Sequence, residues 1–162
     1  MTIWARIQKL SIGQLWKLSL LFLSRPRLIG PTLRATRKTM DICDRLYGKA
    51  HHKSTKGNAF RHALWNYLIC HEHYKIAENK QKAVVWAKKV TTLYEKVTQN
   101  AIIDEKMDLH NNEIGRREFH SNILLKQEEI VSFFSEKTQK AVKITPESRN
   151  YPKNELVYIV EL

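Results

Sequence analysis

Apolar residues recur at three- and four-residue spacing along most of the chain, a pattern typical of helices that bury one face. Val90, Leu93 and Val97 form one such stripe, and Ile130 and Phe134 belong to another. The residues between the stripes are mostly charged or polar, as expected for the solvent side of a helix. The pattern predicts helices at residues 2–12, 14–24, 31–47, 58–77, 80–98, 101–119 and 122–142.

Prolines, glycines and a change of period mark the boundaries between these elements. Pro26 and Pro31 interrupt the helical pattern because each removes a backbone donor. Gly48 is a suitable end for the helix at 31–47, and Asn58 is a suitable N-cap for the next one. The tail at 141–145 and 155–162 has short, partly β-branched runs bounded by turn residues. It predicts a small C-terminal hairpin.

Length and composition indicate one folded unit. The chain has 162 residues, 43% of them hydrophobic, with only 5 glycines and 4 prolines, which is enough for a single core. We predict an all-α, single-domain orthogonal bundle of six or seven helices over 1–162. Within it, 1–56 form basic N-terminal helices, 57–119 form a core with polar motifs, and 120–162 form the last helix and the tail.

Positive charge is concentrated in the N-terminal third. The formal net charge is +12, and residues 1–56 carry 12 Lys/Arg against only Asp41 and Asp44. Such asymmetry favours an anionic partner, either a phospholipid surface or nucleic acid, although a solvated basic surface is an equally open interpretation. The chain lacks the interleaved aromatics and glycines of common nucleic-acid modules, so membrane contact ranks higher.

The first segment, "MTIWARIQKLSIGQLWKLSLLFLSRPRL", is too short and too charged to span a membrane, because Lys17 interrupts its apolar run. No small-residue cleavage site follows it. It could form a basic amphipathic helix on a membrane surface, or it could cover the core. Two isolated cysteines, Cys43 and Cys70, favour a reducing compartment. We therefore expect a cytoplasmic protein, with peripheral contact at the inner membrane left open.

The segment "MDLHNNEIGR", residues 107–116, is too polar for a helix that only buries one face. On a helix, Asp108, Asn111, Asn112 and Gly115 share one side. Asparagine is a mediocre helix former, so two in succession need a reason. Their oxygens could hold a cation, or their amides could bind a substrate oxyanion. Gly115 would allow a close approach to the backbone.

A second polar residue set lies in "NAFRHALWNYL", where His62 stands in an apolar run and must find a partner if buried. Asp108 or an asparagine amide is the expected partner. A His–Asp contact is the minimal general-base unit, but it can equally be a structural bond between two helices. Glu95 is a candidate third member. The trio would suit one divalent metal ion or an acid/base pair.

The spacing of the other histidines is a weaker indication of a metal site. The run "HEH" at 71–73 lacks metal-site spacing, because residues two apart on a helix point in different directions. His51 and His52 lie in a basic loop. For both pairs the sequence favours a solvated surface.

The segments "NAFRHALWNYL", "AKKVTTLYE" and "MDLHNNEIGR" resemble an uncharacterised bacterial domain family frequent in flavobacteria, with the pattern N-x-x-RHA-x-W, His-Glu and MD-x-x-NN-x-x-GR. The match covers 58–116. It implies an all-helical domain with a shared polar cluster and no established reaction. Tyr94 stands where the family often has a histidine, so a ligand or base at that position would be missing. The family's polar positions fall on Arg61, His62, Trp65, Glu95, Asp108, Asn111, Asn112, Gly115 and Arg116.

These observations predict a helical hydrolase, with or without a divalent metal, that acts on a phosphodiester or phospholipid-like substrate. His62, Glu95 and Asp108 would be catalytic residues or metal ligands. The alternative is a non-catalytic basic module that binds a membrane surface or nucleic acid, with the polar residues as a structural network. The predicted substrate-binding residues are Arg61, Trp65, Asn111, Asn112 and Arg116.

Overall fold

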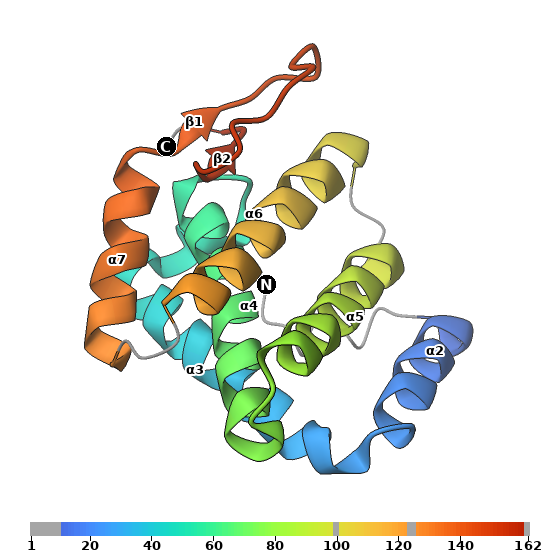
Figure 1. The fold of residues 1–162 in the computed structure, drawn as a ribbon. Coiled ribbons are helices and arrows are strands. Elements are labelled where there is room, and N and C mark those ends of the chain that lie inside the picture. The colour runs from blue at the N-terminus through green and yellow to red at the C-terminus, as the bar shows by residue number, and fades with distance from the viewer. Residues whose placement is uncertain (1–10, 99–100, 123–125, 161–162) are drawn as a thin grey trace.

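The computed structural model describes residues 11–98, 101–122 and 126–160. These residues form an all-α helical bundle, which confirms the predicted fold class (Figure 1). The predicted helix at 2–12 lies almost entirely outside them. The elements are α2 (Ile12–Leu23), η1 (Pro26–Leu28), α3 (Ile29–Tyr47), η2 (Gly48–His52), α4 (Lys56–Ala77), α5 (Lys80–Thr98), α6 (Ile102–Ser121), α7 (Gln127–Gln139), β1 (Val142–Lys143) and β2 (Val157–Tyr158).

Helix α4 is the centre of the bundle. It contacts α3, α5, α6 and α7, and Figure 1 shows it between α5 and α7. All residues from Gly57 to Cys70 are buried, as expected for a helix without a polar face. Its side chains form one hydrophobic core with residues of the surrounding helices. The largest fully buried members are Phe60, Leu64, Tyr67, Ile69, Ile114, Phe119, Ile130 and Phe134.

The start of α4 differs from the prediction. Thr55, with extended backbone angles of φ −99° and ψ 178°, precedes the first helical residue, whereas Asn58 lies inside the helix and is buried. The N-cap prediction for Asn58 is therefore wrong. Gly57, the second residue of the helix, lies so close to Tyr47 that an added Cβ would come within 2.9 Å of the ring.

The tail forms a short sheet, but the predicted hairpin is wrong because β1 and β2 are parallel, with Val142 opposite Val157. Asn111 on α6 holds the second strand. Its amide donates to Val157 O and accepts from Val157 N, both at 2.9 Å. Val157 also packs with Met107 and Ile144 in a small second core. These contacts with α6 fix the direction of β2.

The backbones of α4 and α6 approach closely at one point. A Cβ built on Gly115 would lie 2.1 Å from Ala63 O, which is far inside van der Waals contact. Only glycine permits this approach without movement of a helix. The close contact brings the polar face of α6 against His62 and Asn66 of α4.

Replacing Gly115 with alanine is expected to lower the free energy of unfolding by about 3 kcal/mol, because the new methyl group meets a backbone carbonyl that cannot move freely. Urea unfolding followed by circular dichroism measures the change. Gly13→Ala is the matched control, since a Cβ there has no atom within 4 Å. Equal stability of the two variants would contradict the assigned contact.

Candidate functional site

A buried polar cluster lies where α4, α5 and α6 meet. Each helix contributes residues spaced four apart, so that they share one face. All of them are at most 7% exposed. We call this group the His62 cluster; it comprises His62 and Asn66 on α4, Thr91 and Glu95 on α5, and Asp108, Asn112 and Arg116 on α6.

The imidazole of His62 lies between two carboxylates. Its Nδ1 is 3.4 Å from Glu95 Oε1, and its Nε2 is 3.3 Å from Asp108 Oδ1. Each of the three residues offers a ligand atom within 4.8 Å of the other two. The fold therefore brings together the trio that the sequence singled out, although their spacing in the chain could not show that they meet.

Arg116 fixes the direction of the hydrogen bonds in the cluster. Its Nη1 donates to Asn66 Oδ1 at 2.7 Å, and a guanidinium has no acceptor. The Asn66 carbonyl oxygen must therefore point towards Arg116, and its NH2 group donates to Asn112 Oδ1 at 2.6 Å. Thr91 also donates to Asn66 Oδ1, at 3.1 Å.

The same direction continues to the imidazole. The NH2 group of Asn112 donates to Glu95 Oε1 at 3.3 Å, so Asn112 Oδ1 accepts from His62 Nδ1 at 3.0 Å. On the other side of the ring, Arg61 Nη2 lies 2.7 Å from Nε2 and can only donate. For a neutral His62 ring, these hydrogen bonds assign the proton to Nδ1 and the lone pair to Nε2, which also lies 3.3 Å from Asp108 Oδ1.

A narrow recess reaches His62 from the surface, with space for about one water molecule. Trp65 forms part of its wall. The indole N–H donates to Thr36 at 2.9 Å, and the ring packs edge-on against Tyr94 with centroids 5.2 Å apart. The recess thus presents an imidazole and a guanidinium at an otherwise mostly apolar opening. Its lining residues are Thr36, Thr39, Met40, Arg61, His62, Trp65 and Tyr94.

Not every predicted substrate-binding residue lies at this recess. Arg61 and Trp65 line it, and Asn112 lies behind His62. Asn111 instead binds the backbone of Val157, and Arg116 is engaged with Asn66. A substrate role for these last two residues stays a prediction.

The sequence did not identify several residues that the structure places here. Asn66 is four residues after His62, so its position on the same helical side was a usable signal. Thr91, Thr36 and Thr39 carry no such signal, because isolated threonines in helices commonly bond to their own backbone. All three do so here, with Thr32 O, Ala35 O and Ala87 O as the acceptors.

Formal charges within and beside the cluster balance. The carboxyl groups of Glu95 and Asp108 are matched by the guanidinium groups of Arg61 and Arg116, all at most 7% exposed. Burial lowers the pKa of Arg116 below its usual range. Pairing and hydrogen bonding are what make such buried charge tolerable.

The cysteines take no part in chemistry of this kind. Cys43 and Cys70 are both buried and reduced. Burial raises the pKa of each thiol to about 12, so neither is a thiolate at neutral pH.

The expectation of solvated histidines is wrong for two residues. His51 is 0% exposed and His73 is 7% exposed. His73 belongs to no group of metal-ligating side chains within the described part of the chain. His51 packs beside His52, and both lie near Asp44.

Comparison with known proteins places this chain in a family. A search of curated proteins finds no match to it. Residues 19–142 match the family described as a domain of unknown function, DUF6973. This range runs from α2 to the first residue of β1, so it includes the whole His62 cluster and its recess. The chain therefore belongs to the DUF6973 family of domains of unknown function.

Proposed function

We propose that this protein is a hydrolase that cleaves a phosphodiester and uses His62 as its general base. The observation that carries the proposal is the position of the His62 ring at the recess, with Nε2 2.7 Å from Arg61 Nη2 and a carboxylate on each side of the ring. A neutral imidazole with a fixed tautomer can accept a proton near neutral pH.

In the proposed reaction, a water molecule attacks the phosphorus atom while Nε2 takes its proton. A P–O ester bond breaks, and the proton passes to the departing oxygen. Arg61 turns from Nε2 to bind the non-bridging phosphate oxygens, since guanidinium groups suit phosphate, and this leaves the Nε2 lone pair to accept the proton of the attacking water. The imidazolium that forms is stabilised by Asp108 at 3.3 Å and Glu95 at 3.4 Å.

The remaining cluster residues keep the base in place. Asn112 holds Nδ1, and Asn66 holds Asn112. Their contribution is to orient the ring and to keep its lone pair on the recess side. Arg116 acts here as a positioning residue.

A metal-assisted form of the same proposal uses the same residues. One imidazole nitrogen and two carboxylate oxygens within 4.8 Å of one another are a donor set that suits a divalent ion such as zinc. Metal analysis of the purified protein distinguishes this form from simple acid/base catalysis.

A second candidate function, contact with an anionic membrane surface, is favoured by α2. One face of this helix is apolar, and each residue on it is between 49% and 87% exposed. We call it the α2 apolar face; it comprises Ile12, Trp16, Leu20 and Leu23. Figure 1 shows α2 at the edge of the bundle beside α5. Leu21 and Phe22, on its other side, attach it to the core. None of the described helices is long and apolar enough to cross a bilayer.

Basic residues lie close to this helix. A groove beside it is lined by Arg25, Arg27, Lys82 and Lys89, together with apolar residues such as Trp86. An apolar helix face next to a cluster of cations suits the interface of an anionic lipid layer. Residues 1–10 of the segment that could form an amphipathic helix lie outside the described residues.

The assigned tautomer is testable by NMR. At pH 7 we expect the ¹⁵N shifts of the His62 ring to show a protonated Nδ1 and an unprotonated Nε2, because two arginines at opposite ends of the network can only donate. Exposed His120 is the internal reference for an unconstrained ring. A His62 ring protonated on Nε2 alone would contradict the assignment.

Substitution of the proposed base should abolish most of the activity. His62→Gln is expected to lower kcat/KM by about 100-fold or more, and Asp108→Asn by a smaller factor, since general-base catalysis contributes factors of this size. The substrates are bis(p-nitrophenyl) phosphate and phosphatidylglycerol vesicles. They separate a generic phosphodiesterase from a phospholipase.

Glu113 is an exposed carboxylate on α6, the helix that carries Asp108. Glu113→Gln is therefore the matched control and should retain wild-type activity. Circular dichroism shows whether each variant is folded. A folded Asp108→Asn and His62→Gln pair with wild-type rates, or a wild-type protein inactive on both substrates, would contradict the proposed hydrolase.

The membrane candidate makes a separate prediction. Trp16→Glu should weaken sedimentation with phosphatidylglycerol vesicles by about tenfold, because it removes a large side chain from the lipid contact. Ile102→Glu, at a position 75% exposed on α6, is the control. Binding should fall with added salt. Unchanged binding by Trp16→Glu, or binding to duplex DNA instead of vesicles, would refute it.

A further inference from the structure

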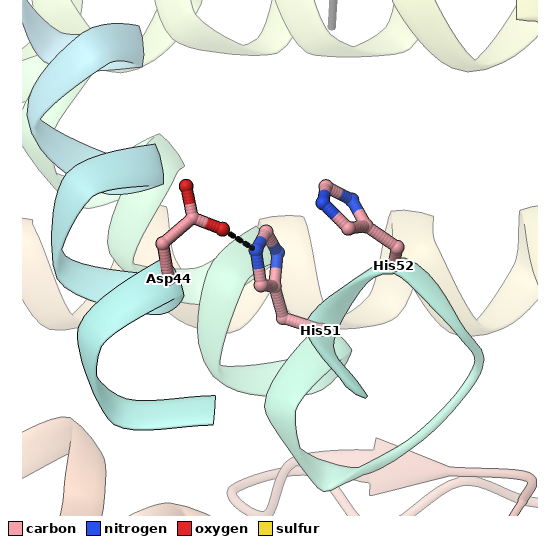
Figure 2. A group of neighbouring side chains, drawn as sticks. All are labelled: Asp44, His51 and His52. Carbon is pink, nitrogen blue, oxygen red and sulfur yellow. Dashed lines mark hydrogen bonds and ion pairs between the residues drawn. The ribbon is translucent and has the colours of Figure 1, made fainter. Parts of the chain in front are cut away.

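A second group of metal-ligating side chains lies at the end of α3, where η2 turns back along the helix (Figure 2). The turn begins at Gly48, whose φ of 52° lies in the left-handed region that favours glycine. The reversal of the chain brings His51 back against Asp44. Asp44 lies in the last turn of α3, next to Arg45. We call Asp44, His51 and His52 the Asp44 site.

The three side chains are already close together. His51 Nε2 lies 2.8 Å from Asp44 Oδ1, and the two imidazole rings are 3.9 Å apart between centroids. Figure 2 shows Asp44 and His52 on opposite sides of the His51 ring. One ligand atom from each residue lies within 4.8 Å of the others.

The loop that carries the histidines is fixed by its own hydrogen bonds. Thr55 Oγ1 and Lys53 N both donate to Ala50 O, at 2.9 and 3.0 Å. The backbone of this loop is therefore set by the fold before any ligand binds, which lowers the ordering cost of binding.

Two buried nitrogens of this site need an explanation. His51 Nδ1 and His52 Nδ1 have no hydrogen-bond partner among the described residues, and the His51 side chain is fully buried. Buried polar atoms are normally paired. A structural His–Asp bond would account for His51 Nε2 alone, and it would leave both Nδ1 atoms unexplained.

The protonation state fits metal binding. Burial lowers the pKa of His51 below its usual value and that of His52 to about 4, which favours neutral rings. Neutral imidazole is the form that ligates metals. The charge of Arg61 also lowers both pKa values and opposes a cation, whereas the Asp44 carboxylate favours one.

We propose that Asp44, His51 and His52 bind a divalent transition-metal ion of the zinc class, at a site distinct from the His62 cluster. Two imidazole nitrogens and one carboxylate oxygen suit Zn²⁺, Co²⁺ or Ni²⁺, whereas Ca²⁺ and Mg²⁺ prefer oxygen ligands throughout. Tetrahedral zinc with bonds of 2.0–2.1 Å places its ligand atoms about 3.3 Å apart. The half-buried His52 and the Asp44 side chain, 60% exposed, are free to close that distance.

Co²⁺ titration of the full chain tests the proposal. The protein carries no polyhistidine tag and is first stripped with EDTA. Visible d–d absorption reports coordination, and Zn²⁺ competes the cobalt off. Asp44→Asn and His52→Gln, at positions that are not fully buried, are each expected to weaken Co²⁺ binding at least about tenfold. His120→Gln is the exposed-histidine control and should bind as the wild type does.

Asp108→Asn separates the two clusters. It should leave the binding that depends on Asp44 and His52 unchanged, whether or not the His62 cluster takes an ion of its own. Broadening of the His51 and His52 ring signals by Co²⁺ in the wild type provides a readout that needs no variant. The proposal is overturned if the wild type does not bind Co²⁺, or if binding survives in Asp44→Asn and His52→Gln, or if it is lost only in Asp108→Asn.

Discussion

The contact between the backbones of α4 and α6 at Ala63 and Gly115 is the constraint on which the rest of the site depends. A side chain at Gly115 would collide with Ala63 O, so the two helices could not approach as they do. The approach lets Asn66 and Asn112 meet directly, at 2.6 Å. Residues one turn away on each helix, including His62 and Asp108, then face each other.

Burying so many polar groups at the centre of a bundle is costly unless each is paired. Here the pairing is directional. A guanidinium has donors and no acceptor, so Arg116 is the donor in its bond with Asn66 and Arg61 is the donor in its bond with His62. The amides between them have one consistent orientation, which makes the cluster specific as well as stable. The same directional hydrogen bonds hold α4, α5 and α6 in register.

Arg61 links the two histidine groups of the molecule. Its guanidinium lies 2.7 Å from His62 Nε2, and its charge adds to the effect of burial on the pKa of His51 and His52. An ion at the Asp44 site would therefore act electrostatically on the residue that lines the recess.

Helical periodicity is local, so the amino-acid pattern alone predicted most of the described helices: the stripe at 80–98 coincides with α5, and the buried positions Asp108, Asn111 and Asn112 lie together on α6. The sequence also indicated His62, Glu95 and Asp108 as candidate catalytic residues or metal ligands. Packing between distant segments decided that these three meet, that Asn111 bonds the backbone of β2, that β1 and β2 are parallel, and that His51 is buried. Each of these depends on which distant element covers a residue, and spacing along one helix contains no information about its neighbours.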